Sequence, residues 1–272
     1  MKKIKIYTFS HKRPDFLKIQ YDSMRMFIKD VEFDFIVFNN ATADNDAGKL
    51  ANHIQSICED LEISSIRIEK DKELLDSLFN SYGEDIFDKR NGYYINVPLA
   101  CAYSLCWAWK HFIHKEESPV FVIDSDMFFT SDTYFSKLFN YDLCYVPQER
   151  DGLDVPYIWN GVFFANLPSL INPGELNWFC GKYNNIPVDV GGQTIEYLKK
   201  YSVDLKNKNI DCQHIPYDDN CDFYPANYEL LKIPENKMPT IIHYRGGSNW
   251  NQMSDEYHVK KTQWIKNKVY GK

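Results

Sequence analysis

The sequence predicts an α/β fold in which a mixed, mostly parallel β-sheet is flanked by helices. The first third of the chain alternates strand-like and helix-like segments, as doubly wound sheets do. Residues 120–123 form a short apolar run rich in β-branched side chains, which is typical of a strand buried on both faces. A chain of 272 residues with 44% hydrophobic residues can enclose one substantial core.

The first strand and helix are predicted at residues 4–10 and 16–27. Pro14 lies between them and suits the first turn of a helix. The residues that recur at helical spacing are Phe16, Leu17, Ile19, Gln20, Met24 and Phe27. The alternation continues with a strand, a helix and a strand at residues 31–38, 50–61 and 63–68. The order β-α-β-α-β indicates the beginning of a doubly wound sheet.

The middle of the chain leads into and away from the strand at 120–123. Residues 70–91 are polar and mixed, so helix and loop are expected there. Residues 98–112 are apolar on nearly all sides, which predicts a buried helix. After the strand we expect a short helix at 130–139, strands at 142–146 and 157–166, a helix beginning at 176–179 and another at 194–201.

The last third is predicted to be looser. Residues 211–228 are rich in Asp, Asn and Tyr and are expected to form a long surface loop. A short strand at 240–244 and a solvent-exposed helix from residue 257 onward complete the chain. We find no repeat or linker, so residues 1–272 are expected to form a single domain.

Composition excludes several classes of function. The net charge is -7, which argues against a nucleic-acid binder that depends on phosphate contacts. No apolar stretch approaches the roughly 20 residues of a membrane span. The seven cysteines lack the spacing of a disulfide framework and no signal-like segment follows Met1. A cytoplasmic protein with reduced thiols is therefore expected.

Two carboxylates one residue apart, Asp124 and Asp126, end the strand at 120–123. Carboxylates this close repel each other, and burial raises the cost of ionising both. A hard divalent cation resolves that conflict because it prefers oxygen ligands. The alternative is a strand end that merely caps a following helix, for which Asp and Ser are also suitable.

Other polar residues follow the ends of neighbouring predicted strands. Ser10 ends the first strand, and Asn39 and Asn40 follow the second. Ligands of open α/β sheets bind outside the carboxyl ends of the strands. Because Asp124 and Asp126 lie at such an end too, these residues are expected to converge on one site.

A strand that ends in Asp-x-Asp (DXD), halfway along a chain opening with β-α-β units, resembles the GT-A class of nucleotide-sugar glycosyltransferases. The segment Trp159-Asn160-Gly161 resembles the strand that lines the acceptor side in that class. The segment from Asp189 resembles the acidic segment that some members place beneath the reacting sugar. His243 is similar to the histidine that several families supply from a C-terminal strand as a third metal ligand.

This resemblance implies a metal-dependent glycosyltransferase with a GT-A-like, Rossmann-like fold. Residues 1–126 would form a nucleotide-binding half and residues 127–272 an acceptor-binding half. The donor would be a UDP- or GDP-linked sugar and the acceptor a hydroxyl group, expected to be that of a glycan. Mn²⁺ or Mg²⁺ would neutralise charge on the departing diphosphate.

The resemblance also implies roles for individual residues. Asp126 and His243 would hold the ion, while Asp124 would contact ribose or reach the ion through water. Arg245 and the turn at Gly246 would offer a cation and backbone N–H groups to the phosphates. The side chains expected to meet the nucleoside are those of Thr8, Ser10 and Asn39.

Asp189 is the expected catalytic carboxylate. If the reaction inverts the sugar configuration, Asp189 would accept the proton of the acceptor hydroxyl. If configuration is retained, the same carboxylate would lie near the anomeric carbon. Asp189 could instead cap the helix predicted at 194–201, just as His243 could be a core histidine and Arg245 a solvated turn residue.

Two other functions remain open. Phosphatases of the haloacid-dehalogenase type also carry Asp-x-Asp after an apolar strand, with the first carboxylate as nucleophile. That motif normally opens the fold, whereas Asp124 follows three predicted strands, and no later Gly-Asp-x-x-x-Asp is present. The other alternative is a non-catalytic module that only binds nucleotide sugars.

Overall fold

A seven-stranded sheet forms the centre of the computed structural model, which describes residues 2–41, 47–82, 97–216, 227–247 and 253–271. In sheet order the strands are β10 (Asn207–Asn209), β6 (Leu143–Gln148), β7 (Tyr157–Ala165), β4 (Val120–Ile123), β1 (Lys2–Ser10), β2 (Val31–Asn39) and β3 (Ser64–Arg67). Neighbouring strands are parallel except that β7 is antiparallel to both β4 and β6. The predicted α/β class with a mixed, mostly parallel sheet is confirmed.

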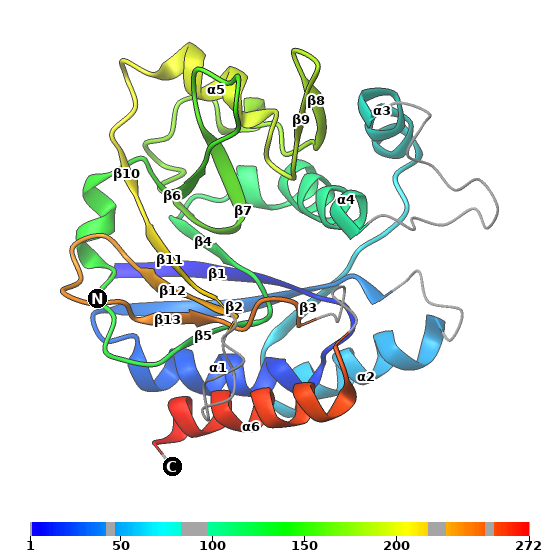
Figure 1. Cartoon of the computed structure of the whole chain (residues 1–272), viewed down its shortest axis with the longest axis vertical. Helices are drawn as coiled ribbons and strands as arrows, with labels where there is room; N and C mark the ends of the chain where they lie inside the picture. The colour runs from blue at the N-terminus through cyan, green and yellow to red at the C-terminus, as the bar shows by residue number, and fades with distance from the viewer. Residues whose placement is uncertain (1, 42–46, 83–96, 217–226, 248–252, 272) are drawn as a thin grey trace.

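Helices cover both faces of this sheet (Figure 1). One side carries α1 (Asp15–Phe27), α2 (Ala47–Asp60) and α6 (Asp255–Tyr270), and the other carries α3 (Lys72–Tyr82), α4 (Val97–His111) and α5 (Thr194–Tyr201). The alternating side chains of β1 divide accordingly, with Ile4 and Ile6 in the core under α1 and Tyr7 in the core under α4. Both Trp107 and Trp109 of α4 are buried, as its all-round apolar character predicts.

A second, four-stranded antiparallel sheet brings the end of the chain to the middle. Its strands in order are β11 (Asp211–Ile215), β12 (Tyr228–Lys232), β13 (Ile241–His243) and β5 (Met127–Phe129). Because β5 starts directly after Asp126 and pairs with β13, His243 lies opposite Met127. Phe128 packs in one cluster with Phe16 of α1 and Ile265 of α6, so both helices cover this sheet.

Several expected elements differ from the structure. No helix begins at 176–179; a 3₁₀ turn at Pro173–Glu175 and a hairpin of β8 (Gly181–Tyr183) and β9 (Ile186–Val188) occur instead. Leu176 and Trp178 are buried against the core under α4, which takes them out of a helical pattern. The helix expected at 130–139 is reduced to a 3₁₀ helix at Ser136–Asn140.

The late segments are also more ordered than expected. The described ends of the loop predicted at 211–228 belong to β11 and β12, which pair with each other. The C-terminal helix α6 is not solvated on all sides, since Trp264, Ile265 and Lys261 are buried. The six described cysteines are free thiols, and Cys221 lies outside the described residues. Within the described ranges, every helix is too short or too polar to cross a bilayer.

Candidate functional site

Three predicted metal ligands meet at one point of the structure. One candidate ligand atom from each of Asp124, Asp126 and His243 lies within 4.8 Å of the other two. Both aspartates are half-buried and His243 is buried. The pairing of β5 with β13 creates this cluster from residues more than a hundred positions apart.

The backbone of the Asp-x-Asp turn is fixed by three neighbouring elements. The Asp124 N–H donates to the carbonyl of Gly161 on β7 at 2.8 Å. From α1, the Gln20 amide donates to the carbonyls of Asp124 at 2.7 Å and Met127 at 3.0 Å. The Tyr244 N–H donates to the Asp126 carbonyl at 2.7 Å. The turn is thereby held in one conformation before any ligand binds.

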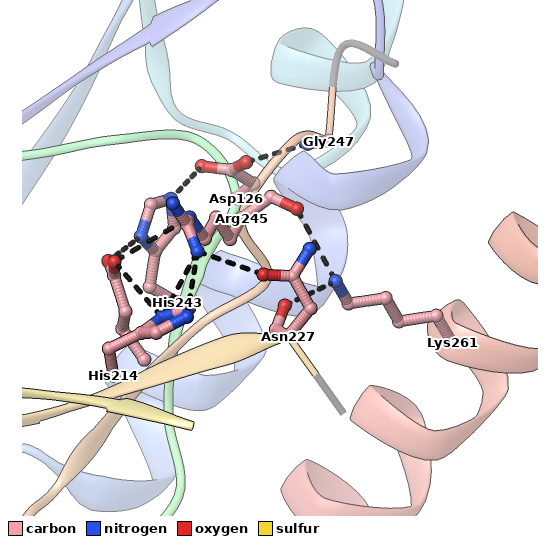
Figure 2. Close-up of polar contacts among 8 residues, drawn as sticks. Asp126, His214, Asn227, His243, Arg245, Gly247 and Lys261 are labelled. Atoms are coloured by element: carbon pink, nitrogen blue, oxygen red, sulfur yellow. Dashed lines mark hydrogen bonds and ion pairs between the residues drawn. The ribbon is translucent and has the colours of Figure 1, made fainter. Parts of the chain in front are cut away.

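The side chain of Asp126 lies between His243 and the turn after β13 (Figure 2). Its Oδ1 is 3.3 Å from His243 Nε2, and its Oδ2 accepts the Gly247 N–H at 2.9 Å. A Cβ on Gly247 would lie 2.8 Å from the Asp126 Cβ, so only glycine permits this approach. The turn itself uses the left-handed region at Arg245 and at Gly246, with φ of 57° and 84°.

The imidazole of His243 is held at a second edge by a residue that the sequence did not single out. Its Nδ1 is 2.7 Å from Oε2 of Glu229, which lies directly opposite on β12. The indole of Trp159 packs against the same imidazole with a centroid distance of 5.5 Å. The apolar residues Tyr228, Leu230 and Leu231 around Glu229 are compatible with a strand, but nothing local indicates the partner of Glu229.

Burial and neighbouring charges together shift the pKa values of these three groups. Burial lowers the pKa of His243, but the carboxylates of Asp126 and Glu229 outweigh it and raise that pKa to about 10. Burial and the charge of Asp126 raise the pKa of Asp124. Burial likewise raises the pKa of Asp126, but attraction to His243 and hydrogen bonds from His243 and Gly247 bring it below its ordinary value. A proton on His243 therefore balances the carboxylates when no cation is bound.

The donor set fits a divalent cation. Two carboxylates supply the hard oxygen ligands that Mg²⁺ and Mn²⁺ take, and the imidazole nitrogen favours a transition ion. Because His243 already has its second nitrogen engaged by a carboxylate, the ring is oriented as in many metal sites. Asp124, Asp126 and His243 are thus suited to hold Mn²⁺, and Mg²⁺ less closely.

The residues expected at the nucleoside lie at the ends of β1 and β2. Thr8 and Ser10 are fully buried, and neither hydroxyl has a hydrogen-bond partner among the described residues. Asn39 is also buried, but its amide donates to the Ala51 carbonyl at 2.8 Å and accepts the Ala41 N–H at 3.2 Å. Asn39 therefore joins β2 to α2, and its contact with a nucleoside stays a prediction.

The segment expected on the acceptor side forms a bulge in β7. Ile158 pairs with Pro147 whereas Phe163 pairs with Tyr145, so β7 carries extra residues between these pairs. Gly161 marks a close approach, as its sequence context suggests: a Cβ there would lie 2.5 Å from the Trp159 indole and 2.9 Å from Asp124 Oδ2. Asn160 is half-buried in the same bulge.

Asp189 and Arg245 differ in their relation to the metal-ligand cluster. Asp189 does not cap α5, whose N-cap is Gln193, and its charge contributes to the raised pKa of Asp124. The Arg245 guanidinium is directed to the hairpin of β11 and β12, where it donates to Asn227 Oδ1 at 2.9 Å. The catalytic and phosphate-binding roles of these two residues stay predictions.

No protein-family model matches the sequence, and a search of curated proteins also finds no match. Matching solved structures include the galactosyltransferase LgtC, with 14% identity, a TM-score of 0.34 and coverage of 60% of this chain and 58% of that one. Mouse xyloside xylosyltransferase 1 matches with 12% identity, a TM-score of 0.33 and coverage of 62% and 68%. The mannosyltransferase Ktr4p from S. cerevisiae matches with 8% identity, a TM-score of 0.37 and coverage of 61% and 56%.

All three are glycosyltransferases, the kind of enzyme that the sequence resemblance implied. The matched part spans less than two thirds of LgtC and of Ktr4p.

Proposed function

We propose that the protein is a metal-dependent glycosyltransferase that moves a sugar from a UDP- or GDP-linked donor to a hydroxyl group of a glycan acceptor. The observation that carries this proposal is the convergence of Asp124, Asp126 and His243 within 4.8 Å. The convergence occurs at the carboxyl end of β4, where open α/β sheets bind ligands.

In this proposal Asp126 and His243 hold the ion, Mn²⁺ or Mg²⁺, with Asp124 beside it. The bound ion would act as a Lewis acid that offsets the charge gathering on the departing diphosphate. Asp126 keeps its position for that task because the Gly247 N–H and the Tyr244 N–H both donate to it. The carboxylate of Asp126 therefore needs little rearrangement when the ion binds.

The donor sugar nucleotide would extend from the cluster toward β1. Thr8 and Ser10 offer buried hydroxyls that have no described partner and that a nucleoside can satisfy. Arg245 and the Gly246 N–H would contact the diphosphate from the other side. We assign the nucleotide to the half formed by residues 1–126 and the acceptor to residues 127–272.

The acceptor would enter beside the bulge of Trp159, Asn160 and Gly161. Asp189 would take the proton from the attacking hydroxyl if the reaction inverts configuration. If the reaction retains configuration, Asp189 would instead stabilise positive charge at the anomeric carbon. Its charge acts on Asp124, which supports a place near the metal-ligand cluster.

A thermal-shift screen of UDP and GDP sugars, with and without Mn²⁺, tests the proposal. A ligand that binds only the folded state adds about 2.7 kcal/mol at a concentration on the order of 100 Kd. We expect stabilisation only when nucleotide and metal are both present, and none in Asp126→Ala. Asp132→Ala is the matched control, because Asp132 is an exposed carboxylate paired with Lys29.

Two results would overturn the proposal. The first is a wild-type protein whose melting temperature responds to neither Mn²⁺ nor any sugar nucleotide. The second is release of phosphate from an aryl phosphate that is abolished in Asp124→Asn, with no response to nucleotides, which would identify a phosphatase.

A further inference from the structure

Two carboxylates hold the imidazole of His243 at opposite ring nitrogens. Asp126 Oδ1 lies 3.3 Å from Nε2, and Glu229 Oε2 lies 2.7 Å from Nδ1. The Trp159 indole covers part of the ring at a centroid distance of 5.5 Å. The imidazole is therefore fixed at two edges and supported by an aromatic ring.

We propose that Glu229 is a positioning residue that sets the tautomer and orientation of His243 for metal binding. An ionised carboxylate only accepts hydrogen bonds, so Nδ1 must carry the hydrogen that it donates to Glu229. The lone pair available to an ion is then on Nε2, the nitrogen that faces Asp126. This inference rests on the metal site of the proposed function and names a residue that acts through His243.

Glu229 is not itself placed to bind the ion. It contacts the ring nitrogen opposite to the one that faces Asp126. The carboxylate and imidazole atoms that gather within 4.8 Å of one another belong to Asp124, Asp126 and His243. A carboxylate on the far nitrogen of a histidine ligand typically raises its basicity and fixes its ring.

The position of Glu229 is set by a clamp at the start of β12 and the end of β13. The clamp consists of Asn227, Arg245 and Lys261. Arg245 donates to Asn227 Oδ1 at 2.9 Å, and its Nε lies 3.7 Å from Glu229 Oε1. The buried ammonium of Lys261 donates to the Asn227 carbonyl at 2.9 Å and to the Arg245 carbonyl at 3.3 Å (Figure 2). Both Asn227 and Arg245 have positive φ, and Lys261 of α6 ties their carbonyls together.

Partners on the outer oxygen of Glu229 complete the arrangement. Arg245 and His214 both lie 3.7 Å from Oε1, which leaves Oε2 for His243. Glu229 is thus an oriented acceptor whose Oε2 faces the side of the ring that the ion does not use.

The test measures Mn²⁺ affinity by calorimetry for Glu229→Gln and Glu229→Met. Glutamine keeps an acceptor oxygen for Nδ1 but loses the charge, whereas methionine removes the acceptor at similar size. Loss of such a partner typically weakens metal binding about 10- to 100-fold. We expect about 10-fold weaker binding in Glu229→Gln and about 100-fold in Glu229→Met. A further readout is the proton NMR spectrum of the Mg²⁺-loaded protein. We expect a low-field signal from the Nδ1–H of His243 in wild type and not in Glu229→Met.

Asp211→Asn is the matched control, because Asp211 is an exposed carboxylate on the same hairpin that faces Lys232 at 3.6 Å. We expect it to bind Mn²⁺ like wild type. If wild type binds Mn²⁺ and both Glu229 variants bind as tightly as Asp211→Asn, the role of Glu229 is overturned while the metal site stands. If wild type binds no Mn²⁺, the metal site of the proposed function is itself wrong. Should Glu229→Met fail to fold, Glu229→Gln decides the question: Mn²⁺ binding about 10-fold weaker than that of Asp211→Asn supports the role of Glu229, and equal binding overturns it.

Discussion

Two regions at the same edge of the sheet satisfy their polar groups in different ways. Around His243 the charged groups of Asp126, Glu229 and Arg245 each lie beside a partner of opposite charge or a hydrogen-bond donor or acceptor. At the end of β1 the hydroxyls of Thr8 and Ser10 are fully buried and have no described partner. A buried polar group without a partner costs free energy, whereas a paired one does not.

The difference indicates two kinds of preparation for a ligand. The network around His243 is complete without a ligand, because a proton on the imidazole takes the place of positive charge from an ion. At the end of β1 the two buried hydroxyls have no partner among the described residues, and in our proposal a ligand supplies it. The first region should therefore govern stability and metal affinity, and the second should govern affinity for the sugar nucleotide.

The largest effect is expected from the clamp of the His243 network. Lys261→Met removes the buried ammonium that donates to Asn227, Arg245 and the Tyr257 hydroxyl. Each buried acceptor left unsatisfied costs about 1–3 kcal/mol, so the free energy of unfolding should fall by about 3 kcal/mol. Urea denaturation measures this loss. Lys266→Met, an exposed position on the same helix, should change it by no more than about 0.5 kcal/mol.

A smaller effect should follow from adding one methyl group beside Asp126. In Gly247→Ala the new Cβ would lie 2.8 Å from Asp126 Oδ2 and 2.9 Å from the Phe16 ring. Overpacking of this kind costs about 1–3 kcal/mol, and displacement of Asp126 should weaken Mn²⁺ binding as well. Thermal melts and calorimetry report the two effects separately.

Gly48→Ala is the control for that substitution. Nothing lies within 4 Å of a Cβ at Gly48, which is in α2. Alanine there should stabilise the protein by about 0.4–1 kcal/mol because it restricts the unfolded chain. Equal effects at both glycines would mean that the close approach to Asp126 has no energetic consequence.

The His243 network should also depend on pH, whereas the hydroxyls of β1 do not titrate. The pKa of His243 is raised to about 10 in the folded protein. Its stabilising contribution is therefore fully present below the unfolded pKa of about 6.5 and is lost as pH rises toward 10. An ion needs the neutral imidazole, so Mn²⁺ affinity should change in the opposite direction and rise with pH.

Melting temperatures of the metal-free protein and Mn²⁺ titrations between pH 6.5 and 10 check both trends. His243→Gln should flatten the stability profile, because the titrating group is gone. A Mn²⁺ affinity that does not change with pH would contradict the proton exchange at Nε2.

The smallest change in stability is expected at the end of β1. Thr8→Val keeps the shape and removes a buried hydroxyl without a described partner, so stability should change by less than about 1 kcal/mol. Binding of a UDP or GDP sugar should nevertheless weaken, because the ligand loses that hydrogen bond. Titration calorimetry with the sugar nucleotide measures this change.

Asn39→Ala provides the contrast at the neighbouring strand. Asn39 is paired with Ala51 and Ala41, so its removal should cost about 1–3 kcal/mol of stability. A Thr8→Val protein that loses as much stability as Asn39→Ala would show that the hydroxyl of Thr8 is already satisfied.

Much of the large sheet could be predicted because its signals are local. The order β1, α1, β2, α2, β3 follows from periodicity within short segments, and Pro14 and the buried run before Asp124 mark element boundaries. The same locality misled the prediction at Leu176 and Trp178, where apolar residues serve the core under α4 and form no helix. A local pattern does not say which surface its apolar side chains will cover.

The sequence by itself determined that two carboxylates one residue apart follow a buried strand and that a histidine lies on a late strand. Only the tertiary structure decided that β5 pairs with β13, which brings His243 to Asp126, and that β12 places Glu229 behind the imidazole. Pairing in an antiparallel sheet depends on which apolar faces are buried together, and more than a hundred residues separate β5 from β13. The candidate ligands could therefore be recognised from short segments of sequence, whereas the residues that hold them in place depend on the packing of distant strands.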